Sequence, residues 1–265
     1  MMFEKLEREV KNGKGAALVT VVRSSGSTPA EVGKLMVVYD DGQIDGTIGG
    51  GNLEKTTIGR AVEMIRKGIS DTISYDLSKD LSMNCGGHVE VFVRVIKPDY
   101  RLIIVGGGHI AYYLNKLAKV INFRTIIFDS RAEMLTKDRY GEADELVLGG
   151  VVENLSTFNF TENDFIVVVT HGHKHDEDAL FEIMDKNVKY IGAIGSRRKV
   201  AIMFDNLKNR GVSEESLKKI YSPIGLTLGG NSPEEIALSI LSEIQFVKSG
   251  RQLAHSRDIK NLSLV

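Results

Sequence analysis

The chain has 265 residues, of which 42% are hydrophobic and 26% charged, a balance typical of a globular protein with one large domain or two modest ones. Its 34 basic and 35 acidic residues give a formal net charge of -1, which argues against nucleic acid or a membrane surface as a main partner. One cysteine excludes an internal disulfide, no apolar run approaches the ~20 residues that span a bilayer, and the first residues predict a polar amphipathic helix rather than a signal peptide. These features predict a cytoplasmic protein.

The first half of the chain predicts a small α+β domain. The expected elements are a helix from Phe3 to Lys11, strands from Ala16 to Val22 and Lys34 to Tyr39, a helix from Asn52 to Lys67, and strands from Asp71 to Tyr75 and Val89 to Ile96. Pro98 interrupts this pattern. We therefore expect an N-terminal domain at residues 1–97, a second domain at 98–249 and a C-terminal tail at 250–265.

The second half predicts a Rossmann-like, doubly wound parallel sheet, so the fold class is α/β. A buried strand runs into Gly106-Gly107-Gly108-His109-Ile110-Ala111, which matches G-x-G-x-x-A, and the next strand ends at Asp129. Gly106, Gly108 and the helix amides after them are candidates to receive a pyrophosphate, and Asp129 is a candidate to bind a ribose. Further strands are expected at Glu145 to Leu148, Phe165 to Val169 and Lys189 to Ala193. A Rossmann scaffold without nicotinamide chemistry stays open as an alternative.

Three alternating histidines follow one of these strands, in Thr170-His171-Gly172-His173-Lys174-His175-Asp176. This segment is expected at the carboxyl end of the sheet, where doubly wound folds bind ligands, so His171 and His173 are candidate contacts. The alternation resembles that of zinc hydrolases, but Asp176 follows the third histidine instead of preceding it, which disfavours a catalytic zinc site. An N-cap role for Asp176 is the structural alternative.

A later loop begins a helix with Ser196-Arg197-Arg198-Lys199. Ser196 predicts an N-cap, and the three cations after it oppose the helix dipole. An anionic ligand would remove that conflict. Ser196, Arg197 and Arg198 are therefore candidate ligand-binding residues.

Two polar loops in the first half are suited to oxyanions. Their candidate residues are Arg23, Ser24, Ser27 and Thr28 in the first loop and Gly49, Gly50, Gly51 and Glu54 in the second. Hydroxyls in the first loop and free backbone amides in the second would hold a phosphate together with Arg23, while Glu54 would cap the loop or bond a heterocycle. A pair of ordinary turns is the alternative.

The single cysteine, Cys85, precedes Gly86 and Gly87, which leave the sulfur without side-chain cover. His88 is placed to take its proton or to stabilise a thiolate. A small buried hydrophobic residue is the alternative interpretation. No site is predicted for a resident metal ion.

Together, these motifs resemble the xanthine dehydrogenase accessory factor family, often called XdhC/CoxI, over nearly the whole chain. The matching stretches are Gly26 to Pro29, Gly46 to Gly51 with Glu54, Cys85 to Gly87, Gly106 to Ala111, Thr170 to His173, Gly192 to Arg198, and Gly225 with Pro233 to Ile236. The resemblance implies a protein that binds molybdenum cofactor, assists the exchange of its terminal oxo ligand for sulfur, and delivers it to a molybdenum hydroxylase such as xanthine dehydrogenase. Asn84 is a departure, since members often have glycine there.

The resemblance makes Cys85 the functional thiol, contacting molybdenum or relaying a persulfide from a cysteine desulfurase. It implies a cofactor chaperone, expected as a homodimer, more than an enzyme. On the residues alone, two other functions stay open: an NAD(P)-dependent oxidoreductase using Gly106, Gly108 and Asp129, and a metal hydrolase using His171, His173 and His175. The client enzyme is not specified by any motif.

Overall fold

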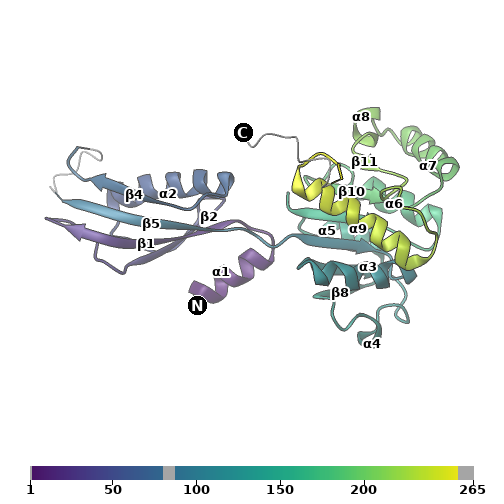
Figure 1. Cartoon of the computed structure of the whole chain (residues 1–265), viewed down its shortest axis with the longest axis horizontal. Helices are drawn as coiled ribbons and strands as arrows, with labels where there is room; N and C mark the ends of the chain where they lie inside the picture. Colours follow the sequence, from purple (N-terminus) through teal and green to yellow (C-terminus); the bar gives the residue numbers. More distant parts are fainter. Residues whose placement is uncertain (1, 80–86, 256–265) are drawn as a thin grey trace. The chain divides into compact units, whose positions relative to one another are not determined.

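The computed structural model describes residues 2–79 and 87–255, and Cys85 and Gly86 therefore lie outside the described residues. The chain divides into two compact units, Met1–Asp99 and Tyr100–Val265 (Figure 1). Each unit has its own sheet and its own hydrophobic core. The predicted fold class, a Rossmann-like sheet with a smaller α+β domain before it, is confirmed.

The first unit is an antiparallel five-stranded sheet with two helices. Its elements are α1 (Met2–Lys11), β1 (Ala16–Ser25), β2 (Leu35–Tyr39), β3 (Ile44–Gly46), α2 (Gly51–Lys67), β4 (Asp71–Asp76) and β5 (His88–Ile96), with strand order β3-β2-β1-β5-β4. The prediction missed β3, whose three residues are too few to show an alternating pattern. Strand β1 is longer than predicted because, beyond an irregularity after Val21, it continues to pair with β5 up to Ser25, opposite His88.

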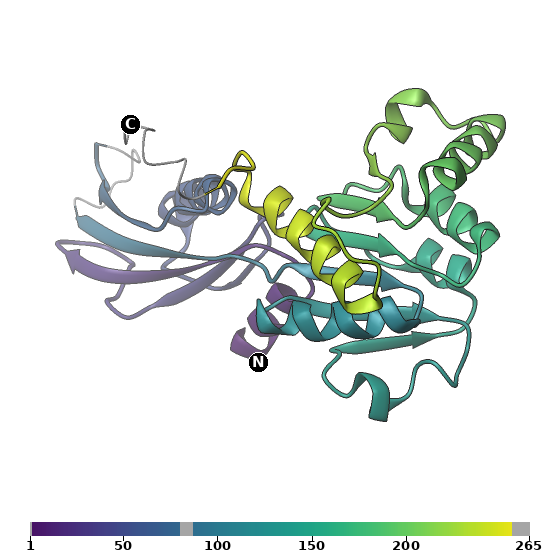
Figure 2. The same cartoon turned by 45° about the vertical axis from the view of Figure 1, so that its right-hand side comes forward.

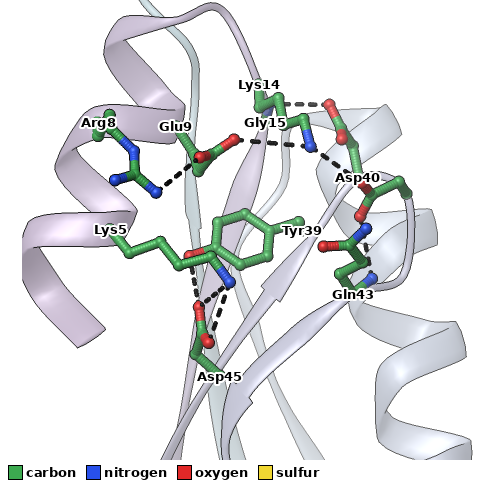
Figure 3. Close-up of polar contacts among 10 residues, drawn as sticks. Lys5, Arg8, Glu9, Lys14, Gly15, Tyr39, Asp40, Gln43 and Asp45 are labelled. Atoms are coloured by element: carbon green, nitrogen blue, oxygen red, sulfur yellow. Dashed lines mark hydrogen bonds and ion pairs between the residues drawn. The ribbon is translucent and has the colours of Figure 1, made fainter. Parts of the chain in front are cut away.

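Alternation along β1 separates the two faces of this sheet. Ala17, Val19 and Val21 are fully buried in the cluster that includes Leu53 and Ala61 of α2. Ala16 belongs to a smaller cluster that includes Leu6, Val37 and Tyr39, so α1 packs on the other face. Polar contacts reinforce this second packing: Tyr39 donates a 2.8 Å hydrogen bond to Asp45, which also pairs with Lys5 of α1 at 2.9 Å (Figure 3).

The second unit alternates strands and helices. Its elements are β6 (Arg101–Val105), α3 (His109–Val120), β7 (Arg124–Asp129), α4 (Lys137–Tyr140), β8 (Glu145–Leu148), α5 (Val151–Thr157), β9 (Asp164–Val168), α6 (His173–Ile183), β10 (Tyr190–Ala193), α7 (Arg197–Asn209), α8 (Glu214–Leu217), β11 (Ile220–Tyr221) and α9 (Pro233–Ser249). The sheet is parallel, in the order β11-β10-β9-β6-β7-β8. Counted within the unit, this is the 3-2-1-4-5-6 order of dinucleotide-binding folds.

Helices cover both faces of this sheet (Figure 2). Ile103 and Val105 belong to the core that includes residues of α5, α6 and α7, whereas Leu102 and Ile104 belong to the core that includes residues of α3 and α9. Nearly continuous apolar strands are the consequence of burial on both sides. Within the described residues, no helix is both long and apolar enough to cross a bilayer.

Candidate functional site

The strand order of the second unit creates a switch point between β6 and β9, where consecutive connections leave toward opposite sides of the sheet. The glycine turn that follows β6 lies against the end of β9. Gly106 has a φ of 112°, and a Cβ there would lie 2.5 Å from the Val169 carbonyl oxygen. Only glycine allows this close approach, so the turn brings the start of α3 to the carboxyl edge of the sheet.

Gly108 has a different role in the same turn. It is the N-cap of α3, no side chain caps the helix there, and a Cβ at this position would meet nothing within 4 Å. Ala111 is fully buried, which allows α3 to pack closely on the sheet. The helix start therefore presents backbone amides and the positive end of the helix dipole toward open space, an arrangement suited to an anion.

Asp129, the candidate ribose ligand, is held by the protein itself. Its carboxylate accepts hydrogen bonds from the Gly107 amide at 2.6 Å and from the Arg131 side chain at 2.7 and 2.9 Å. Burial opposes its ionisation, but the bonds from Arg131 and Gly107 outweigh burial and hold the pKa of Asp129 below its usual value. Asp129 is only 4% exposed, so a ribose would have to displace these partners.

The histidine segment begins α6 at the same edge of the sheet. Gly172 is the N-cap of this helix, so the N-cap role considered for Asp176 is wrong. Asp176 is instead a buried residue of the first turn, and its carboxylate accepts bonds from the Thr170 amide at 3.1 Å and the Thr170 hydroxyl at 2.6 Å. These bonds fix the loop that carries His171, which is exposed.

The side chain of His173 lies outside the described part of the structure, so the predicted role of His173 stays a prediction. Among the described residues, no three histidines, cysteines or carboxylates are placed to hold a metal ion together.

Helix α7 starts at the end of β10, beside β9. Ser196 is its N-cap, as predicted, and accepts a 3.4 Å bond from the Lys199 amide. Arg197 and Arg198 are exposed, and neither forms a salt bridge within the part of the chain that the structure describes. Because β6, β9 and β10 are parallel neighbours, these cations share the carboxyl edge with the start of α3.

In the first unit, three segments distant in sequence meet at one end of the sheet. A Cβ on Gly49 would lie 3.0 Å from the Pro29 carbonyl, and one on Gly87 would lie 2.8 Å from the carbonyl oxygens of Ser25 and Ser27. The two predicted polar loops therefore lie against each other, and the residue that follows Gly86 packs on the first of them. Glycine is required at positions 49 and 87 for backbone packing.

Several predicted ligand groups in these loops already have partners. The Ser24 hydroxyl donates to the Ala30 carbonyl at 2.7 Å, and the Thr28 hydroxyl accepts from the Ala30 amide at 3.1 Å. Ser27 and Gly51 are exposed.

Glu54 organises the second loop. Its carboxylate accepts bonds from the Thr47 hydroxyl and from the amides of Ile48 at 3.1 Å and Gly50 at 3.2 Å. Burial opposes ionisation of Glu54, but these bonds prevail and lower its pKa. The Gly49 amide donates to the Thr47 hydroxyl at 3.1 Å. The expectation of free amides in this loop is therefore wrong for residues 48, 49 and 50, because Glu54 and Thr47 accept their hydrogen bonds.

Sequence reasoning missed Glu90 and Arg131. Arg23 is largely exposed and lies 3.4 Å from Glu90 of β5, which also lies 3.8 Å from the His88 ring. The alternating pattern of β5 places His88 and Glu90 on one face, but pairing with Arg23 depends on strand register. Arg131, two residues after Asp129, was recognisable as a local partner for that carboxylate.

Family comparison agrees with this architecture. The XdhC Rossmann domain model matches residues 102–244, and the XdhC and CoxI family model matches residues 10–76. The first match alone covers more than half of the chain. The chain therefore belongs to the XdhC and CoxI family, as the motifs predicted.

Curated relatives span different shares of this sequence. The molybdenum cofactor insertion chaperone PaoD of Escherichia coli (strain K12) is 24% identical, over 89% of this chain and 85% of PaoD. A probable xanthine dehydrogenase subunit of Bacillus subtilis (strain 168) is 32% identical, over 58% of this chain and 44% of that protein. The uncharacterized protein YqeB of E. coli (strain K12) is 29% identical, over 88% of this chain and 43% of YqeB. The chain thus spans less than half the length of the last two.

A solved structure from Bacillus halodurans, described as a xanthine dehydrogenase, has the same fold. The superposition covers 96% of this chain and 97% of that chain, with a TM-score of 0.53 and 23% sequence identity.

Proposed function

We propose that this protein is an accessory factor that binds the molybdenum cofactor, assists its sulfuration and helps its insertion into a molybdenum hydroxylase such as xanthine dehydrogenase. The observation that carries the proposal is membership of the XdhC and CoxI family together with the alignment to an insertion chaperone over 89% of the chain. A cysteine desulfurase is the sulfur source in this proposal. The cofactor is cargo, which the protein holds and passes on.

The second unit supports the proposal with an anion-binding edge. The cofactor carries a phosphate, and the uncapped start of α3 at Gly108 offers amides beside open space. Arg197 and Arg198 add positive charge at the same edge of the sheet. In this proposal Gly108 and the two arginines hold the phosphate, while Thr170 and Asp176 fix the loop that carries His171.

The first unit supports the proposal with its loop-lined end. Gly87, which Cys85 precedes by two residues in the sequence, packs against Ser25 and Ser27. Arg23 of β1 and His88 of β5 are exposed and share Glu90 as partner. In this proposal the soft thiolate of Cys85 is a ligand for molybdenum or a carrier of persulfide sulfur.

The strand order supports the alternative function, an NAD(P)-dependent oxidoreductase, whereas the hydrogen bonds of Asp129 argue against it. The order of the sheet and the glycine turn are those of dinucleotide-binding folds. The carboxylate expected to hold the ribose is bonded to Gly107 and Arg131 instead. We therefore place cofactor delivery first.

A reconstituted maturation assay tests the proposal. A molybdenum hydroxylase lacking its cofactor is incubated with molybdenum cofactor, a cysteine desulfurase and this protein, and cyanide-labile sulfur and activity in the hydroxylase are measured. The wild type should raise both, and Cys85→Ser should leave molybdenum insertion measurable while reducing sulfuration to the level without accessory protein. Full sulfuration by Cys85→Ser would refute the thiol's role, and no effect of the wild type would refute the function.

A further inference from the structure

A second concave surface of unit 2 lies at the end of the sheet opposite the switch point. It is a pocket of about 290 Å³ at the amino-terminal ends of β10 and β11, whose parallel pairing sets Ile191 beside Ile220. The residues just before these strands therefore lie next to each other. The charged and aromatic residues that line the pocket are Lys186, Lys189, Lys218, Lys219, Tyr190 and Tyr221.

The charge of this pocket is unbalanced. None of its lining residues is acidic. Lys186 pairs with Glu182 at 3.2 Å, whereas Lys189, Lys218 and Lys219 form no salt bridge with any described residue. Ammonium groups gathered without a counter-charge repel one another, and a multivalent anion among them would turn that repulsion into attraction. Because the whole chain has a formal net charge of -1, this excess of positive charge is confined to the pocket and is not a property of the whole surface.

The pocket also has a rigid aromatic wall. The rings of Tyr190 and Tyr221 stack with centroids 4.6 Å apart at 27°. Tyr190 is buried, and its hydroxyl donates to the carboxylate of Glu243, so its ring is fixed. Tyr221 is 40% exposed and offers aromatic surface beside the lysines. A planar group can stack on such a ring without further side-chain ordering.

We propose that this pocket binds a small phosphate-bearing ligand, with a nucleoside diphosphate favoured over inorganic pyrophosphate. The lysines hold the phosphates, and the base stacks on Tyr221. The volume is close to the lower limit of about 300 Å³ for small-molecule sites, which suits a diphosphate enclosed with the base partly outside. This site is separate from the switch point, because Lys189 precedes β10 whereas Arg197 follows it, at the same carboxyl edge of the sheet as the glycine turn after β6.

Titration calorimetry of the full chain with ADP and with inorganic pyrophosphate tests the site. Lys189→Gln/Lys219→Gln should weaken both ligands at least tenfold. The matched control Lys67→Gln/Lys137→Gln, which removes the same charge from exposed helix positions, should bind as the wild type does. Tyr221→Leu should weaken ADP and leave pyrophosphate unchanged. Thermal melting of every variant checks the fold.

A variant of the switch-point arginines tests whether the anion binds there instead of in the lysine pocket. If Arg197→Gln/Arg198→Gln abolishes binding while the lysine variant retains it, the anion binds at the switch point and the lysine pocket is refuted. Equal affinity of the lysine variant and wild type, or no saturable wild-type binding up to about 1 mM of either probe, would also refute it. If the lysine variant weakens ADP and pyrophosphate equally and Tyr221→Leu changes neither affinity, the pocket is an anion site, and its ligand is an inorganic phosphate.

Discussion

The backbone amide of Gly107 donates a 2.6 Å hydrogen bond to the carboxylate of Asp129, which ties the glycine turn after β6 to the end of β7. Arg131 fixes the same carboxylate from the following loop. In dinucleotide-binding folds a carboxylate at this place takes ribose hydroxyls. In this protein the Asp129 carboxylate instead accepts hydrogen bonds that fix the turn leading to Gly108.

Asp129→Asn is expected to destabilise the second unit in a pH-dependent way. Burial disfavours the charged form, but Arg131 and Gly107 outweigh it and lower the pKa of Asp129. The ionised group therefore contributes stability above its unfolded pKa of about 4, and this contribution is lost as pH falls through the folded pKa. Urea unfolding should give a difference of about 1–3 kcal/mol at pH 7 that shrinks below about pH 4. A difference that stays constant from pH 7 to pH 3 would contradict this assignment.

Two glycines of the same turn should respond differently to alanine. Gly106→Ala places a Cβ against the Val169 carbonyl at a φ of 112° and should cost about 2–4 kcal/mol of unfolding free energy. Gly108→Ala meets no atom within 4 Å and should leave the melting temperature within about 2 °C. It should nevertheless weaken cofactor binding, since the methyl group occupies the space before the start of α3. Unchanged cofactor affinity in a folded Gly108→Ala protein would argue against an anion there.

Glu54 should control the order of the glycine-rich loop. Glu54→Ala removes the acceptor of the Ile48 and Gly50 amides, and hydrogen exchange at these two amides should accelerate about tenfold, equivalent to about 1.4 kcal/mol. Because its pKa is lowered, the same acceleration should develop in the wild type as pH falls below the usual carboxyl range, after correction for intrinsic exchange. The exposed Glu63→Ala on the same helix serves as control and should leave both amides protected. Equal protection in both variants would refute the role of Glu54.

The contact between α1 and the β2–β3 hairpin should be weak and salt-sensitive. Lys5 and Asp45 are partly exposed, with side chains 36% and 26% accessible, so their pair should contribute about 0.2–1 kcal/mol (Figure 3). A double-mutant cycle with Lys5→Ala and Asp45→Ala, measured in low salt and again in about 1 M salt, checks this. A coupling energy that salt does not reduce would indicate that the contacts of both residues with Tyr39, rather than their direct ion pair, couple Lys5 to Asp45.

The sequence predicted what depends on local pattern. Ser196 as a helix cap and the glycine turn before α3 follow from short-range chemistry, and the structure confirms these elements. The parallel direction of the strands in the second sheet followed from their alternation with helices. These local patterns can be recognised without knowing the tertiary contacts between side chains.

The rest depended on the exact backbone turns and on contacts between distant segments. Glu54 was recognised as a cap or ligand, but its use of two loop amides depends on the backbone turn at Gly49 and Gly50, each with positive φ. Glu90 meets Arg23 across 67 positions through the pairing of β1 with β5, including an irregularity that no pattern in the sequence indicated. The roles predicted for Cys85 and His173 remain predictions.

Cofactor capture is the most direct test of the central claim that this protein carries the molybdenum cofactor. The purified protein is incubated with cofactor released from a donor enzyme and passed over a gel-filtration column, and molybdenum and pterin eluting with it are quantified for wild type, Cys85→Ala and Gly108→Ala. We predict near-stoichiometric molybdenum and pterin with the wild type and reduced retention of both with Cys85→Ala and with Gly108→Ala. Absence of both from the wild-type fraction would contradict the claim.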